Sequence, residues 1–188
     1  MGRMKTSNRP VWLDSLQGAL QPHPGAGAPH DLSAGRGVPE RPLRLAILGI
    51  GNELNADDGA GVLVARALKA RLAPNPQLLV LEAGAAPENF GGPLRRFQPT
   101  LVLMIDAVQM DAPPGAITWL AWEQIDGLSA STHTLPPSVF ATYLMSELGC
   151  RVSLLGIQAA CLEMGEPLSA AVQAAVEEVA AALVEALA

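Results

Sequence analysis

The sequence predicts an α/β fold, a three-layer sandwich in which a mostly parallel, twisted sheet carries helices on both faces. Short apolar runs bounded by Gly or Pro are typical of buried strands, and here they alternate with segments of helical periodicity. The clearest unit is the stretch 45–70, in which an apolar run, a glycine turn, two adjacent aspartates and a helical pattern follow one another. With 188 residues, 49% of them apolar, the chain can form one domain with a full core.

Residues 1–42 are predicted to be a disordered or flexible N-terminal extension, and residues 43–188 to be the folded domain. The stretch 21–41 is dense in Pro, Gly and Ala, so it buries too little apolar surface to offset the entropy of ordering it. Val11, Trp12, Leu13 and Leu16 could form a short docking turn. We expect a chain that starts near Arg41 to keep its activity.

The remaining elements are predicted in chain order from apolar periodicity and from Pro and Gly signals. Pro74 and Pro76 end the first helix, Pro87 suits the first turn of the second, and Gly149 ends the third. Strands are expected at 43–50, 77–82, 100–105, 116–120 (as an edge strand) and 151–157, and helices at 58–72, from 87 to before 99, at 137–148 and at 168–187.

Composition and charge exclude several kinds of partner. The net charge is −6 without a basic run, which disfavours nucleic acid and anionic membrane surfaces. No apolar stretch reaches transmembrane length, and the N-terminus lacks the apolar core of a signal peptide. Cys150 and Cys161 have no metal-type spacing and are too few for a disulfide scaffold, so a cytoplasmic location is expected.

The glycine turn after the first strand does not match a nucleotide-binding motif. Gly49 and Gly51 begin a dinucleotide fingerprint, but its third glycine would fall on Leu54. A phosphate-binding loop needs a Gly-Lys-Ser/Thr sequence, and no Lys lies between residues 45 and 64. A nucleotide-dependent enzyme is therefore a weak rival hypothesis.

Four polar residues lie where an open α/β fold offers a ligand site, at strand ends or in the loops before helices. Asp57 and Asp58 stand between the first strand and its helix, where they are either helix N-caps or site groups. Asp106 follows the third strand and is either a turn acid or a site group. His133 is in a Ser/Thr-rich loop, where a surface histidine is the simpler interpretation.

Taken together, Asp58, Asp106 and His133 offer two carboxylates and one imidazole. This mixed oxygen and nitrogen set suits a borderline divalent metal such as nickel or zinc, and it suits calcium poorly. Three protein ligands would leave positions open for water or for a group of the substrate. His23 and His30 lie in the extension, where we expect a solvated tail and not a second metal site.

At these motifs the chain resembles the hydrogenase maturation endopeptidases, with the likeness extending from residue 43 to about 187. Three motifs carry it: Gly49-Ile50-Gly51-Asn52-x-Leu54-x-x-Asp57-Asp58-Gly59-x-Gly61, Ile105-Asp106-Ala107 and Ser131-Thr132-His133. The segments 83–89, 131–136 and 155–158 look closest to the branch that processes hydrogenase 3, part of formate hydrogenlyase.

The resemblance implies an enzyme that removes the C-terminal extension of a nickel–iron hydrogenase large-subunit precursor after nickel insertion. It implies that Asp58, Asp106 and His133 contact nickel supplied by that precursor and act in cleavage. It also implies a monomer, without nucleic acid partner, membrane insertion or other cofactor. A non-catalytic binding module of the same fold is the alternative, because an α/β fold does not establish an activity.

Overall fold

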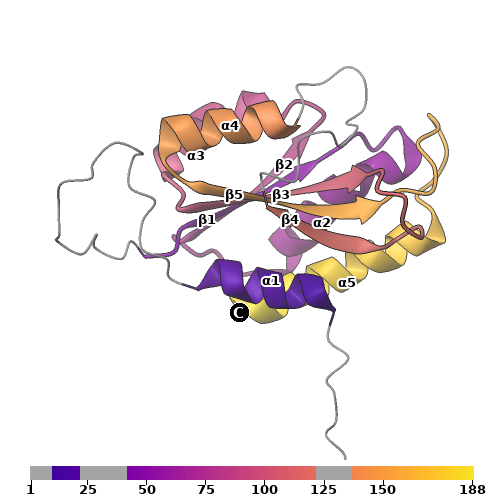
Figure 1. Ribbon diagram of the computed structural model, residues 1–188, viewed down its shortest axis with the longest axis horizontal. Helices are drawn as coiled ribbons and strands as arrows, with labels where there is room; N and C mark the ends of the chain where they lie inside the picture. Colours follow the sequence, from indigo (N-terminus) through magenta and orange to yellow (C-terminus); the bar gives the residue numbers. More distant parts are fainter. Residues whose placement is uncertain (1–9, 22–41, 122–136) are drawn as a thin grey trace, which may run out of the picture.

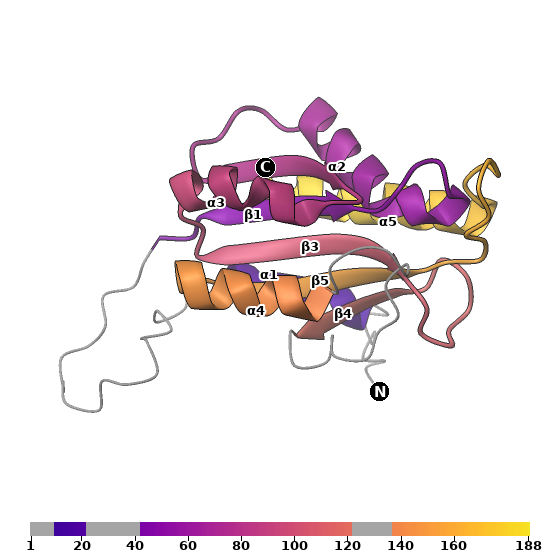
Figure 2. The same cartoon turned by 90° about the horizontal axis from the view of Figure 1, so that it is seen from above.

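A five-stranded sheet forms the middle layer of the computed structural model, which describes residues 10–21, 42–121 and 137–188 (Figure 1). The strand order is β2-β1-β3-β5-β4, and Figure 2 shows the last four strands side by side. β1, β2, β3 and β5 are parallel, and the edge strand β4 runs antiparallel to β5. The strands are β1 (Leu45–Ile50), β2 (Leu78–Gly84), β3 (Leu101–Val108), β4 (Ile117–Ala121) and β5 (Arg151–Gln158).

Helices cover both faces of this sheet. They are α1 (Val11–Leu20), α2 (Ala60–Arg71), α3 (Gly91–Phe97), α4 (Pro137–Leu148) and α5 (Ala170–Leu187), with the short 3-10 helices η1 (Ala56–Gly59) and η2 (Pro87–Phe90). In Figure 1, α3 and α4 lie above the sheet and α1 and α5 below it. The predicted three-layer sandwich with a mostly parallel sheet is therefore confirmed.

The alternation of side chains along each strand builds two separate cores. On β1, Leu45 and Ile47 pack against α1, α2 and α5, whereas Ala46 and Leu48 pack against α3 and α4. All six residues of β1 are buried, which is expected for a parallel strand covered on both faces. This double burial explains why the sequence of β1 is continuously apolar.

The predicted extension is wrong at residues 11–20, because these residues form the helix α1 and pack on the core. Trp12 and Leu16 are only 5% and 1% exposed and belong to the same apolar cluster as α2 and α5. The Arg151 guanidinium donates a hydrogen bond to the Ala19 carbonyl at 2.8 Å. α1 covers an apolar part of the sheet face, so its own apolar side chains become buried. This burial stabilises the short helix. Residues 1–9 and 22–41 lie outside the described residues.

Strand order creates a switch point between β1 and β3, where a ligand site is expected. From β1 the chain crosses through α2 to β2 on one side, and then passes through α3 to β3 on the other side of β1. Connections that diverge in this way leave room at the carboxyl ends of the two central strands. No helix in the described parts of the chain is long and apolar enough to span a membrane.

Candidate active site

A tight turn after β1 builds the floor of the candidate site. Gly51 has a φ of +125°, and a Cβ at this position would overlap the carbonyl oxygen of Asp58. The Gly51 N–H donates to the Gly84 carbonyl at 3.1 Å, which ties the turn to the end of β2. Gly49 and Gly61 face each other so closely that a Cβ on either would overlap neighbouring backbone. Glycines therefore allow η1 and α2 to start directly against the ends of β1 and β3.

Asp58 and Asp106 come together beside this turn. Asp58 lies in η1, and its Oδ2 accepts a hydrogen bond from the Asn52 N–H at 3.1 Å. Asp106 lies near the end of β3, and its Oδ1 would be 3.7 Å from a Cβ placed on Gly51. The two side chains are 8% and 7% exposed. The predicted meeting of these acids at the carboxyl edge of the sheet is thus found.

Burial raises the pKa of both carboxyls, and the charge of Asp58 adds to the rise at Asp106. Burial raises the pKa of Asp58, and hydrogen bonds from Asn52 and Asn55 reverse only part of that rise. Burial and the charge of Asp58 together raise the pKa of Asp106 to about 8, although the Ala107 N–H opposes them. The pair therefore keeps a proton, on Asp106, to a higher pH than an isolated aspartate does. A group that brings positive charge would relieve the repulsion.

Asp57 has a different role from the one that helix capping predicts. Its carboxylate accepts hydrogen bonds from the backbone N–H groups of Ala160 (2.7 Å), Cys161 (2.9 Å) and Ser169 (2.7 Å), and from the Ser169 hydroxyl (3.0 Å). Neither η1 nor α2 has a side-chain N-cap. Burial raises the pKa of Asp57, but these hydrogen bonds outweigh it, so the pKa is lowered. Asp57 therefore fastens the segment between β5 and α5 to the site.

Ser169 is a contributor to this framework that the sequence analysis missed. It is the N-cap of α5, and its hydroxyl accepts a hydrogen bond from the Val172 N–H at 3.4 Å. The Ser-Ala-Ala start of the last helix is a recognisable capping signal, which places Ser169 at a helix end but not beside Asp57. Asp57 and Ser169 are 112 positions apart in the sequence, so no local pattern could predict their contact.

The third predicted ligand, His133, lies outside the described residues. Among the residues that are described, no group of three or more His, Cys, Asp or Glu side chains is arranged to hold a metal ion. Asp58 and Asp106 alone form the observed part of the predicted ligand set. Two neighbouring buried carboxyls offer the oxygen ligands of a divalent cation or the acid and base of a hydrolysis.

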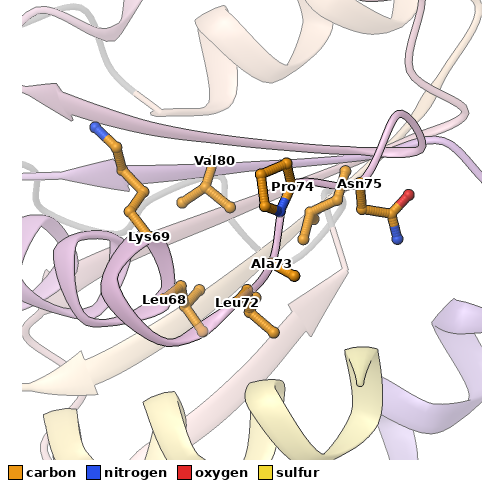
Figure 3. A pocket seen from close by; sticks show the side chains of 8 residues that line it. Leu68, Lys69, Leu72, Ala73, Pro74, Asn75 and Val80 are labelled. Carbon is orange, nitrogen blue, oxygen red and sulfur yellow. The ribbon is translucent and has the colours of Figure 1, made fainter.

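A hollow of about 220 Å³ lies at the opposite end of the sheet and does not belong to this site (Figure 3). Its walls include Leu68 from α2, Leu72 and Pro74 from the following loop, and Leu78 from the start of β2. Figure 3 shows mostly apolar side chains around it. It lies at the amino end of β2, whereas ligands of open α/β sheets bind at the carboxyl ends.

Comparison with known proteins decides the family. The sequence model described as HycI, hydrogenase maturation protease, matches residues 62–186. The chain belongs to the hydrogenase maturation protease family. The hydrogenase 3 maturation protease of Escherichia coli K12 is 34% identical over 134 residues, which cover 71% of this chain and 84% of that protein. The family resemblance drawn from the motifs is thus confirmed.

Solved structures of the hydrogenase maturation protease family share the fold. The crystal structure of HycI from Thermococcus kodakarensis superimposes with a TM-score of 0.71 at 33% identity, covering 77% of this chain and 92% of that one. HybD from the same organism gives a TM-score of 0.61 at 27% identity, covering 76% and 98%. The α/β architecture around Asp58 and Asp106 is therefore that of a maturation protease.

Proposed function

We propose that this chain is an endopeptidase that removes the C-terminal extension of a nickel–iron hydrogenase large-subunit precursor after nickel insertion. Membership of the hydrogenase maturation protease family supports the type of reaction, and the similarity to a hydrogenase 3 maturation protease supports the type of substrate. The observation that carries the proposal is the meeting of Asp58 and Asp106, both buried, at the turn after β1.

In this proposal the chain recognises the precursor by the nickel that the precursor carries. Two buried carboxyls that repel each other favour a divalent cation, and the cation would displace the proton that Asp106 holds at neutral pH. His133 is proposed as the third ligand, from the sequence motif alone. Oxygen and imidazole ligands suit nickel. A precursor without nickel would present no cation to this pair, so it would be left uncleaved.

Hydrolysis needs a base that accepts a proton from the attacking water. The carboxylate oxygens of Asp58 and Asp106 that do not contact the metal are proposed for this task, because both groups are ionised once the cation has displaced the proton. Asp106 lies within β3, and Asp58 lies in η1 with its carboxylate held by the Asn52 N–H, which keeps both side chains oriented. Neither proposed step requires a covalent intermediate with a protein nucleophile.

Mass spectrometry of precursors mixed with this protein tests the proposal. Nickel-loaded precursor should lose the mass of its C-terminal extension, and nickel-free precursor should not. Asp58→Ala, Asp106→Ala and His133→Ala should each slow cleavage at least 100-fold, by analogy with the loss of a group that orients or binds a metal. Glu185→Gln is the control, because Glu185 is an exposed acid on α5 and lies outside the candidate active site.

Two outcomes would contradict this proposal in different ways. Binding of loaded precursor without any mass loss would show a non-catalytic binding module. Cleavage by His133→Ala at the wild-type rate would remove His133 from the ligand set, and equal cleavage of loaded and nickel-free precursor would remove nickel recognition.

A further inference from the structure

Three large apolar side chains stand exposed beside the candidate active site. Leu54 is 68% exposed, Met164 is 79% exposed and Leu162 is 42% exposed. They come from two segments, the turn after β1 and the connection between β5 and α5, which are joined by a 2.8 Å hydrogen bond from the Gly165 N–H to the Leu54 carbonyl. We call these three side chains the apolar rim.

The backbone that carries Leu54 is fixed, although its side chain faces solvent. The Leu54 N–H donates to the Asn52 Oδ1 at 3.1 Å, and its carbonyl accepts from Gly165. The neighbouring Glu53 makes two hydrogen bonds to the Arg66 guanidinium of α2, at 2.6 and 2.9 Å. These hydrogen bonds fix the backbone from which the exposed Leu54 side chain extends. Such pre-organisation lowers the cost of binding a partner.

The apolar rim and the candidate active site share one framework. Asn52, which fixes Leu54, also donates its N–H to the Asp58 carboxylate. Asp57, adjacent to Asp58, holds Ala160 and Cys161, which lead directly into the segment of Leu162 and Met164. The rim therefore lies close enough to Asp58 for a protein substrate at Asp58 to contact both.

Charge around the rim identifies the chemistry of its partner. Glu88, Asp111, Glu163 and Glu166 are exposed at this end of the sheet. Arg66 contacts Glu53 and Glu82, and Lys69 also contacts Glu82, so these cations are paired. Arg44 and Arg151 precede or begin strands and so lie at the opposite end. The described surface around the rim is therefore acidic and attracts basic groups.

We infer that the apolar rim is the docking surface for the hydrogenase large-subunit precursor, and that it takes a precursor segment in which apolar side chains adjoin basic ones. This inference rests on the proposed function and adds the surface that selects the substrate protein. Apolar contact with Leu54, Leu162 and Met164 supplies the affinity, and the surrounding carboxylates orient the segment. Exposed apolar side chains rimmed by charge are typical of protein interaction sites.

Steady-state cleavage of nickel-loaded precursor by the full-length chain tests this inference. The double variant Leu54→Ser/Met164→Gln should raise KM roughly tenfold and leave kcat within about twofold, because it removes binding surface and no reacting group. Val11→Ser is the matched control, since Val11 is 81% exposed on α1 and lies outside the rim; its KM should be unchanged. Thermal melts should show that the double variant is folded.

Each result separates this inference from the proposed function. If the wild type cleaves the precursor and the double variant keeps the wild-type KM, the rim does not dock the precursor, and the proposed function stands. If the wild type cleaves no precursor, the proposed function is wrong, and the precursor is then also not the partner of the rim. If the wild type dimerises and the double variant is monomeric, with KM unchanged, the rim contacts a second copy of this chain, which overturns the inference.

Discussion

At the scale of single residues, adjacent Asp57 and Asp58 have opposite surroundings. Asp58 is buried beside a second acid, which raises the cost of its negative charge. Asp57 accepts four hydrogen bonds from a segment that is distant in the sequence. Asp57→Ala would leave three backbone N–H groups without an acceptor, and we expect it to cost about 3 kcal/mol or more of unfolding free energy. This exceeds the roughly 1 kcal/mol of a lost helix cap. Denaturant unfolding measures it, with the exposed Glu185→Ala as control.

The Asp57 prediction also has a pH dependence. Because its pKa is lowered on folding, the stabilisation should be present above the ordinary aspartate pKa and be lost on acidification below it. An unfolding free energy of Asp57→Ala close to that of Glu185→Ala would show that the four hydrogen bonds do not fasten the segment.

Asp106 should affect stability in the opposite sense. Its folded pKa is about 8, above the unfolded value of 3.8, so the folded chain binds more protons between these values. Its contribution to stability should therefore fall as pH rises from about 4 to about 8, and stay constant above that. Asp106→Asn, which cannot ionise, should remove this fall. Thermal melts of metal-free protein from pH 4 to 9 measure it; identical profiles for wild type and variant would contradict it.

At the scale of elements, α1 is part of the folded core, so we expect the stability of the chain to depend on it. Trp12 and Leu16 lie in the core cluster with α2 and α5, so removing residues 1–21 would expose the sheet face that they cover. Trp12→Ala should cost about 3–5 kcal/mol, whereas Val11→Ser, at an 81% exposed position, should change stability little. Unfolding curves of full-length variants measure this. A truncated chain that melts like the wild type would restore the expectation of dispensability.

Local pattern predicted the elements well and their long-range contacts poorly. The burial of β1 and of one face of α5 could be predicted from the sequence. A continuous apolar run is typical of a strand covered on both faces, and an apolar stripe is typical of a helix covered on one. Strand order, the antiparallel direction of β4 and the packing of α1 depend on residues far away. At the site, the motifs predicted the meeting of Asp58 and Asp106. The partners of Asp57 were missed because they lie more than 100 residues away.

At the scale of the whole molecule, exposed carboxylates lie beside the candidate active site. Exposed Glu163 and Glu166 lie near the carboxyl ends of the strands, and Arg44 and Arg151 lie near the amino ends. With a net charge of −6, these carboxylates give the surface beside the candidate active site a negative potential. Such a field should accelerate association with a substrate segment that carries basic groups.

Reversing this field should slow association without changing the chemistry. Glu163→Lys/Glu166→Lys should lower the association rate constant for the loaded precursor several-fold at low salt, because steering by charge acts before contact. Glu178→Lys/Glu185→Lys brings the same change of net charge on exposed positions of α5 and should have little effect. Stopped-flow measurements at rising salt decide the matter: near 1 M, where charges are screened within about 3 Å, both doubles should match the wild type. Equal slowing by the two doubles would show that net charge, and not its position beside the rim, controls association.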